Sequence, residues 1–111
     1  MSAYRLQQLP TFKRQAKRLL KKYVSFQNDL RALAGALIAD PTMGTALGQD
    51  CYKIRLAITS KNRGKSGGAR VITYVKVVGQ TIYLLTVYDK SDREDLAPGE
   101  LDDLLTAAGL G

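Results

Sequence analysis

The chain contains no histidine and no tryptophan, and it has one cysteine, Cys51, among its 111 residues. The absence of histidine removes the side chain that most often transfers protons near neutral pH, and it excludes histidine-containing metal sites. A single cysteine excludes an intramolecular disulfide. Because no histidine is present to activate its thiol, Cys51 is better explained as a buried residue than as a nucleophile. We therefore expect neither a metal nor another cofactor.

Long hydrophobic runs are also missing, since no apolar segment approaches the ~20 residues that a membrane-spanning helix needs. The N-terminus lacks the basic start and apolar stretch of a signal peptide. Hydrophobic residues nevertheless make up 45% of the chain, which is enough for a modest core. We expect one domain over residues 1–111, located in the cytoplasm and without a membrane partner.

Acidic residues are scarce outside the C-terminal segment, and the formal net charge is +7. Residues 1–24 hold seven basic groups and no acid, and residues 51–78 hold another seven and no acid. Residues 79–111 hold seven acids against two basic groups, Lys90 and Arg93. Charge concentrated in this way favours an anionic partner such as RNA, DNA, an acidic protein or a membrane surface, although a soluble basic surface explains it as well.

Hydrophobic periodicity predicts an α+β domain. An edge strand is expected over residues 4–9, a helix from Pro10, and a second helix from Ser25 to Asp40. Alternation then predicts three strands near residues 52–59, 69–78 and 81–88, and a last helix starts near Pro98. The helix hairpin should pack on one face of an antiparallel sheet, with the C-terminal helix added, which leaves the opposite face free to be polar.

The polar face of the predicted sheet collects basic residues. Lys53 and Arg55 lie two positions apart on the first meander strand, so they point to the same side. The residues that share one side of the next strand are Arg70, Ile72, Tyr74 and Lys76. Lys90 follows the third strand, and the loop at residues 61–66 adds three more cations. A basic surface with an aromatic ring suits RNA, because cations hold phosphates and a ring stacks on a base.

The same residues have the chemistry for RNA cleavage without a metal. The 2′-hydroxyl must lose a proton and attack phosphorus, the phosphoryl charge must be offset, and the leaving oxygen needs a proton. A lysine crowded by cations can act as the base, whereas arginine is suited to stabilising charge. Lys53 beside Arg55 and Arg70 meets that description, although polar residues on an exposed sheet face are also ordinary.

Three segments resemble the RelE/HigB-like branch of the RelE/ParE superfamily, the toxins of type II toxin–antitoxin systems. Residues 50–56 (DCYKIRL) resemble the first meander strand of RelE-type toxins, and residues 64–74 (GKSGGARVITY) look like a segment of the HigB-like branch. Residues 82–91 (IYLLTVYDKS), followed by Leu96 and the pair at 100–101, are similar to that branch's last strand and helix. The resemblance covers most of the chain and is strongest from residue 50 to 105.

The resemblance implies a RelE/ParE-like fold and an mRNA interferase, an endoribonuclease that cleaves messenger RNA in the ribosomal A site and inhibits translation. It also implies a cognate antitoxin that blocks the active site and through which the complex binds operator DNA. Matched by position, the implied catalytic residues are Lys53, Arg55, Arg70 and Lys90. We predict that the RNA-binding residues are Lys61, Arg63, Lys65, Tyr74 and Tyr88. A tyrosine of RelE itself falls at Leu96, so its role is lost or moved here.

Two other functions are compatible with the sequence. A ParE-like toxin shares the fold and poisons DNA gyrase, but such chains generally lack a basic sheet face. A binding module for RNA or an antitoxin, with a decayed active site, would explain the missing tyrosine. Because one fold carries several functions, the architecture alone does not distinguish these alternatives.

Overall fold

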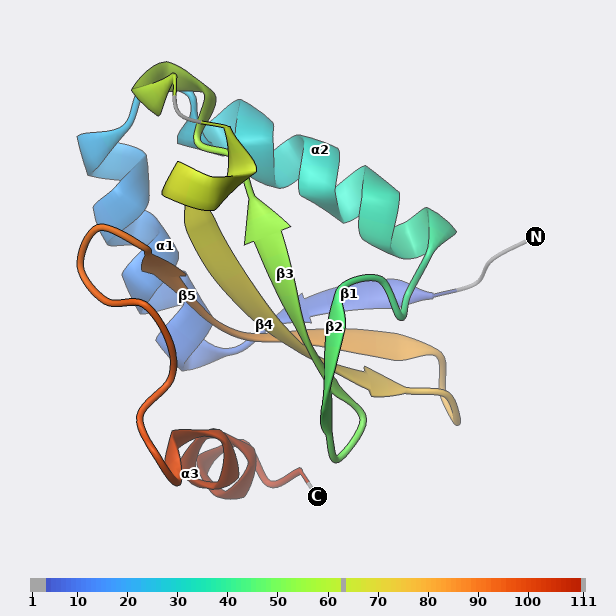
Figure 1. Cartoon of the computed structure of the whole chain (residues 1–111). Coiled ribbons are helices and arrows are strands. Elements are labelled where there is room, and N and C mark those ends of the chain that lie inside the picture. The colour runs from blue at the N-terminus through green and yellow to red at the C-terminus, as the bar shows by residue number, and fades with distance from the viewer. Residues whose placement is uncertain (1–3, 63, 111) are drawn as a thin grey trace.

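A central β-sheet with helices on both faces organises the chain (Figure 1). The computed structural model describes residues 4–62 and 64–110. In chain order the elements are β1 (Arg5–Gln8), α1 (Pro10–Lys22), α2 (Phe26–Ala39), β2 (Thr45–Gly48), β3 (Cys51–Leu56), the 3-10 turns η1 (Thr59–Lys61) and η2 (Lys65–Gly67), β4 (Ala69–Lys76), β5 (Thr81–Asp89) and α3 (Glu100–Ala107). The predicted α+β class is confirmed, and no described helix is long and apolar enough to cross a membrane.

The sheet of the described residues has the strand order β1-β5-β4-β3-β2. Strands β3, β4 and β5 form the predicted antiparallel meander. The predicted edge strand is β1, and it pairs with β5 in parallel, which makes the sheet mixed. Strand β2, on the other edge, was not predicted, because its four residues are mostly exposed and show no alternation.

The hairpin between β4 and β5 differs from the predicted one. Strand β4 ends at Lys76, two residues earlier than expected, and Val77 and Val78 are 68% and 81% exposed. Lys76 pairs with Thr81, so the connection is a four-residue loop and not a two-residue turn. The two valines extend the hydrophobic alternation in the sequence, but they have no core to face.

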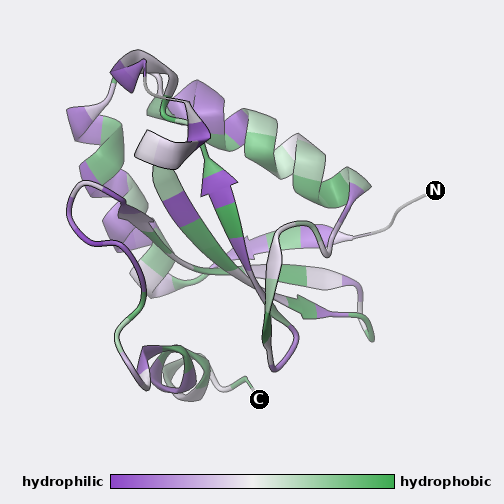
Figure 2. Cartoon of the chain, viewed as in Figure 1, coloured by the Kyte–Doolittle hydropathy of each residue, from purple (hydrophilic) through white to green (hydrophobic). Residues whose placement is uncertain are grey.

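One face of the sheet carries the main hydrophobic core, under α1 and α2. Helix α1 begins with a proline in its first turn, as predicted, and buries Phe12, Ala16 and Leu19. Figure 2 shows its polar residues on the side away from the sheet. The apolar stripe of α2 packs into the same cluster, which also contains Ile54 and Val71 of the sheet. The predicted helix pair over one sheet face is thereby confirmed.

The other face is partly covered, which corrects the expectation that it is free to be polar. A second apolar cluster contains Cys51, Ile72, Leu85 and Tyr88 of the sheet together with Leu105 of α3. Ile72 lies on this face because it shares the parity of Arg70, and the amphipathic helix α3 shields it from water. In Figure 1, α3 lies at one end of the sheet, opposite the end where α1 and α2 meet. The covered and polar parts of the face therefore lie at different ends.

A buried carboxylate joins three distant segments at the uncovered end. Asp89, at the end of β5, is 1% exposed and accepts hydrogen bonds from the Lys61 ammonium (2.7 Å), the Tyr23 hydroxyl and the Ser91 backbone amide (2.9 Å). Burial alone would raise the pKa of Asp89, but these hydrogen bonds outweigh burial and lower the pKa to about 2. The charged form of Asp89 is therefore part of the folded state.

A second carboxylate holds the start of the loop after β3. Asp29 of α2 accepts hydrogen bonds from the backbone amide and hydroxyl of Thr59, and from the Ser25 hydroxyl at 2.8 Å. Ser25 occupies the cap position predicted for α2, but its hydroxyl makes no capping hydrogen bond and accepts one from the Ser60 amide instead. The loop is thus fixed to α2 by side chains that are buried or partly buried.

We predict that the Asp89→Asn variant loses a specific part of the pH dependence of stability. A pKa lowered from 3.8 to about 2 contributes about 2 kcal/mol of stability above pH 4, and this contribution disappears as the pH falls toward 2. Urea unfolding measured between pH 2.5 and 7 should therefore show a steeper acid loss in the wild type than in Asp89→Asn. The exposed Asp40 provides the control, since Asp40→Asn should behave like the wild type. Identical acid profiles for the wild type and Asp89→Asn would contradict the assignment.

Candidate functional site

Three of the predicted site residues lie side by side across the central strands. Arg55 of β3 pairs with Arg70 of β4, and Arg70 pairs with Tyr88 of β5. Paired residues on neighbouring strands point to the same face and lie about 5 Å apart. Lys53 shares this face, two residues before Arg55 on β3. The structure therefore brings together Lys53, Arg55, Arg70 and Tyr88.

Arg70 is held rigidly below the surface. The residue is only 5% exposed. Its guanidinium donates to the carbonyl oxygens of Lys65 (3.0 Å), Ala69 (3.0 Å) and Ser66 (3.4 Å). These bonds use three of the five N–H groups of a guanidinium, which leaves two for another acceptor. Arg70 thus orders turn η2 and still presents positive charge to the face.

Arg55 and Lys90 complete the cationic group at this end. Arg55 is exposed, and its side chain makes no hydrogen bond or ion pair with any residue that the structure describes. Lys90 is half-buried, and its backbone amide donates to the Gly68 carbonyl at 3.0 Å. Gly68 has to be a glycine, because a Cβ there would lie 2.1 Å from the Leu56 carbonyl oxygen. The hydrogen bond to Gly68 places the Lys90 backbone beside the start of β4, near Arg70.

Lys53 has an acidic partner that the sequence did not reveal. Its ammonium lies 3.3 Å and 3.4 Å from the two carboxylate oxygens of Asp95, which follows β5 in the connection to α3. The same carboxylate accepts the Leu96 backbone amide at 2.8 Å and lies 3.5 Å from the Tyr88 hydroxyl. The Leu96 amide and the Lys53 ammonium hold the pKa of Asp95 below its ordinary value. The face is therefore not purely cationic.

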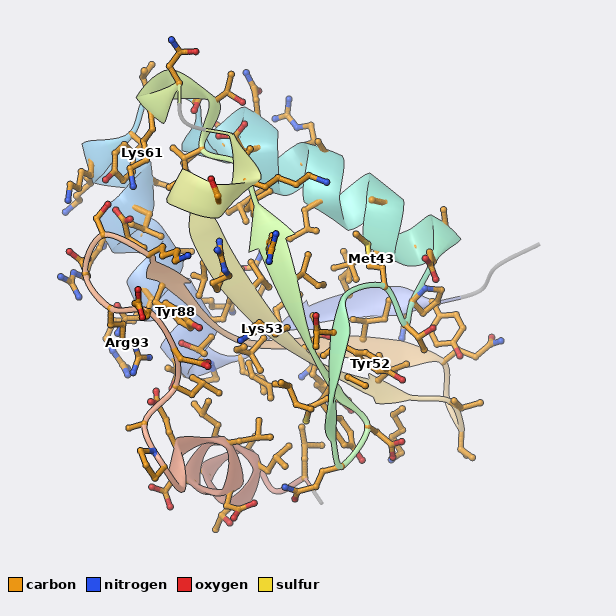
Figure 3. The ribbon with its side chains drawn as sticks, viewed as in Figure 1. Met43, Tyr52, Lys53, Lys61, Tyr88 and Arg93 are labelled. Carbon is orange, nitrogen blue, oxygen red and sulfur yellow. The ribbon has the colours of Figure 1, made fainter. Side chains whose placement is uncertain are left out.

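Tyr88 is enclosed by charged neighbours. The guanidinium of Arg93 lies 4.7 Å from the centre of its ring, and Arg93 forms a two-bond ion pair with Glu100 at 2.6 and 2.8 Å. Burial, supported by the nearby Asp95 carboxylate, raises the pKa of Tyr88 to about 12. Figure 3 shows Tyr88 and Arg93 next to each other, with Lys53 on the same side of the sheet. The phenol thus stays protonated at neutral pH, and Arg93 covers its ring.

The remaining predicted RNA-binding residues are spread around this group. Lys61 is 10% exposed, and its ammonium donates to Asp89, to the Ser91 hydroxyl and to the Gly67 carbonyl, so binding RNA would require it to leave these partners. Lys65 is exposed at the loop tip. Tyr74 packs against Tyr83 with ring centres 5.9 Å apart, four residues along β4 from Arg70. Arg63 lies outside the described residues.

Three further observations concern metal binding, the cysteine and the position of the missing tyrosine. Among the residues that the structure describes, no group of three or more Cys, Asp or Glu is arranged to hold a metal ion. Cys51 is buried as predicted, and burial raises the pKa of its thiol to about 11. Leu96, at the position of the missing tyrosine, packs against the second apolar cluster.

A second basic surface follows helix α1, around the edge of the sheet. The exposed basic residues of this helix are Lys13, Arg14, Lys17, Arg18, Lys21 and Lys22. A pocket of about 530 Å³ lies between α1 and the end of β5, and its lining includes Arg18, Lys22, Tyr88 and Arg93. The lining also includes Asp89 and Asp92, and because Tyr88 and Arg93 lie beside Asp95, the pocket connects the α1 surface to the polar sheet face.

Comparison with known proteins identifies the family of the chain. The sequence model of the family described as "RelE toxin of RelE / RelB toxin-antitoxin system" matches residues 8–110. The chain belongs to the RelE toxin family. Its structure is similar to that of a double arginine-to-alanine mutant of the E. coli toxin RelE in the free state, with a TM-score of 0.59 and 22% sequence identity over 85% of this chain and 90% of that chain. The structural likeness supports the RelE-like fold, and the family implies an antitoxin as partner.

In this RelE-family chain we predict that Arg70→Lys loosens turn η2. A lysine ammonium cannot bridge the separate carbonyls that the guanidinium contacts, and charged hydrogen bonds of this kind contribute roughly 1.5–3 kcal/mol. Hydrogen–deuterium exchange in a peptide covering residues 57–68 should become about tenfold faster or more. Arg55→Lys makes the same chemical change on the neighbouring strand and should leave this exchange unchanged. Equal exchange in both variants would show that Arg70 does not hold the turn.

Proposed function

We propose that this chain is the toxin of a type II toxin–antitoxin pair and acts as a ribosome-dependent endoribonuclease that cleaves messenger RNA in the A site. The observation that carries the proposal is the group of cations on one sheet face: Lys53, Arg55 and Arg70, with Lys90 beside them. Membership of the RelE toxin family supports the toxin role. Action on ribosomes would place the protein in the cytoplasm, and it would need no metal.

The four cations have different tasks in this proposal. Arg55 is exposed and free to contact a phosphate, while Arg70 is fixed with two N–H groups unused, so both suit the stabilisation of charge on the phosphoryl oxygens. Lys90 would bind the phosphate or assist the leaving group. Lys53 is the predicted proton acceptor, and its ammonium lies 3.3 Å from a carboxylate oxygen of Asp95.

RNA would be bound beyond the reacting phosphate by the residues around this group. Lys65, at the exposed loop tip, is the most accessible of the predicted contacts. Because Arg93 lies over the Tyr88 ring, a base could stack on this ring only if Arg93 moved away from it. Arg93 could then stack on the opposite side of the same base. Lys61, Arg63 and Tyr74 stay sequence-based predictions of RNA contact. Tyr74 would contact a nucleotide several positions away from the scissile bond, since four strand residues span about 13 Å.

Helix α1 would extend the contact to the sugar–phosphate backbone. Its six basic residues are unopposed by any acid within the helix, and its 13 residues span about 20 Å. Of these side chains, Lys22 lies 3.9 Å from Asp89, and Arg18 donates to Gln15. The helix lacks an exposed aromatic residue for stacking bases, so its contribution would be electrostatic and independent of sequence.

The cognate antitoxin is the expected protein partner. By covering the cationic face it would prevent RNA from reaching Arg55 and Arg70, and the complex would bind operator DNA through the antitoxin. An acidic segment of the antitoxin would complement the cationic face of a chain whose formal net charge is +7.

We predict that Arg55→Ala removes most cleavage of messages in growing bacteria. The protein should be induced without its antitoxin, and new 5′ ends should be mapped on messenger RNA. The wild type should cut within translated regions, in frame with codons, whereas Arg55→Ala and Arg70→Ala should lose most cuts because the phosphoryl charge is no longer offset. Lys76→Ala removes an exposed cation from the far end of β4 and should cut like the wild type.

Other outcomes of this experiment would favour the alternatives. Growth arrest with intact messages and a DNA-damage response would indicate a gyrase poison. Tight binding of an antitoxin or RNA without growth arrest would indicate a binding module that has lost catalysis. Full activity of both arginine variants would show that cleavage does not use this sheet face.

Replacing Lys13, Lys17 and Lys21 together by glutamine should weaken binding to RNA by reducing its electrostatic component. The slope of log K against log salt concentration is negative, and the loss of three phosphate contacts reduces its magnitude by about 2 to 3. Binding of the labelled protein to purified ribosomes should be measured from 50 to 300 mM salt. If the triple variant showed the same slope as the wild type, α1 would be excluded from the RNA-binding surface.

A further inference from the structure

The contact between Lys53 and Asp95 bears directly on which group removes the proton. Among the residues that the structure describes, Asp95 supplies the carboxylate that contacts the cationic group, through Lys53. Its side chain is 61% exposed, so it is open to a ligand bound on the face, whereas the Lys53 side chain is 26% exposed. One carboxylate oxygen, Oδ1, is fixed by the Leu96 amide at 2.8 Å, which leaves Oδ2 as the freer oxygen beside Lys53.

The other groups near the position proposed for the phosphate are poor proton acceptors. Arginine does not lose its proton in proteins, which excludes Arg55 and Arg70. The phenol of Tyr88 is buried, and its pKa of about 12 keeps it protonated. The Lys53 ammonium donates to both carboxylate oxygens of Asp95, at 3.3 Å and 3.4 Å. The chain contains no histidine, so a carboxylate is the remaining base.

We propose that Asp95 is the catalytic base of the cleavage reaction, and that the Lys53 ammonium serves the phosphate. This inference rests on the proposed function, because it names the proton acceptor of that same site. The carboxylate takes the proton of the 2′-hydroxyl as the bond between the 2′-oxygen and phosphorus forms. The bond from phosphorus to the 5′-oxygen breaks, and the 5′-oxygen takes a proton from the Lys53 ammonium or from Lys90. The products are a 2′,3′-cyclic phosphate and a 5′-hydroxyl.

The surroundings of Asp95 fit a base that works across the neutral range. The groups that face it are Lys53 from β3, Tyr88 from β5, and Arg93 and the Leu96 amide from its own segment. These neighbours hold the pKa of Asp95 below its ordinary value. Asp95 is therefore already an ionised carboxylate, able to accept a proton, throughout the neutral pH range. An ordinary lysine, with a pKa of about 10.4, would be neutral in only about one molecule in 2,500 at pH 7.

The test is single-turnover cleavage of a message bound to ribosomes, measured as a function of enzyme concentration and of pH from 6 to 9. Asp95→Asn keeps the shape of the side chain and an acceptor for the Leu96 amide, but removes the base. We expect its maximal rate to fall about 100-fold or more, with less than about a threefold change in the half-saturating concentration. Glu94→Gln, which neutralises the adjacent exposed acid, should cleave like the wild type.

The pH profile distinguishes the two candidate bases independently of any variant. With Asp95 as base, the wild-type rate stays nearly level from pH 6 to 9. A rate that rises about tenfold per pH unit would assign the role to an amine and overturn the proposal. A faster Asp95→Asn variant would also overturn it, since Asp95 would then only compete with RNA for Lys53. If the wild type does not cut ribosome-bound messages at all, the proposed function fails, and this inference fails with it.

Discussion

The buried carboxylate of Asp89 is the contact on which the geometry of the cationic face depends. It ties the C-terminal end of α1, through Tyr23, and the loop after β3, through Lys61, to the end of β5. Removing one partner of a buried ion pair leaves an unpaired charge, which is costly, so the three segments are held together. Tyr88 precedes Asp89 and Lys90 follows it, and both positions are therefore fixed relative to Arg70.

The face itself balances fixed and mobile charge. Arg70 is immobilised by backbone carbonyls, whereas Arg55 and Lys65 are exposed and can adjust to a ligand. The acidic C-terminal segment supplies the counter-charges, with Asp95 on Lys53 and Glu100 on Arg93. Helix α3 covers the apolar end of the same face through Leu105, which leaves a bounded polar region at the other end. The uneven charge along the chain thus becomes a site with both signs of charge.

Local pattern predicted much of this arrangement. Strand alternation placed Lys53, Arg55 and Arg70 on one face, and helical periodicity located α1 and α2, because both signals depend on neighbours within a few residues. The partners that change the chemistry lie far away in sequence. Lys53 and Asp95 are 42 residues apart, and Lys61 and Asp89 are 28 apart, so neither contact leaves a local signal. The covering by α3 was missed for the same reason, whereas the short strand β2 was missed because its mostly exposed residues show no alternation.

The end groups of the cleaved RNA test most directly whether side chains on this face drive attack by the 2′-hydroxyl. Purified protein should be added to ribosomes that hold a message with a defined A-site codon, and the fragments should be analysed by mass spectrometry. A 2′,3′-cyclic phosphate on the upstream fragment and a 5′-hydroxyl on the downstream fragment are predicted. A 5′-phosphate would require water as the nucleophile and would contradict the mechanism derived from Arg55, Arg70 and Asp95.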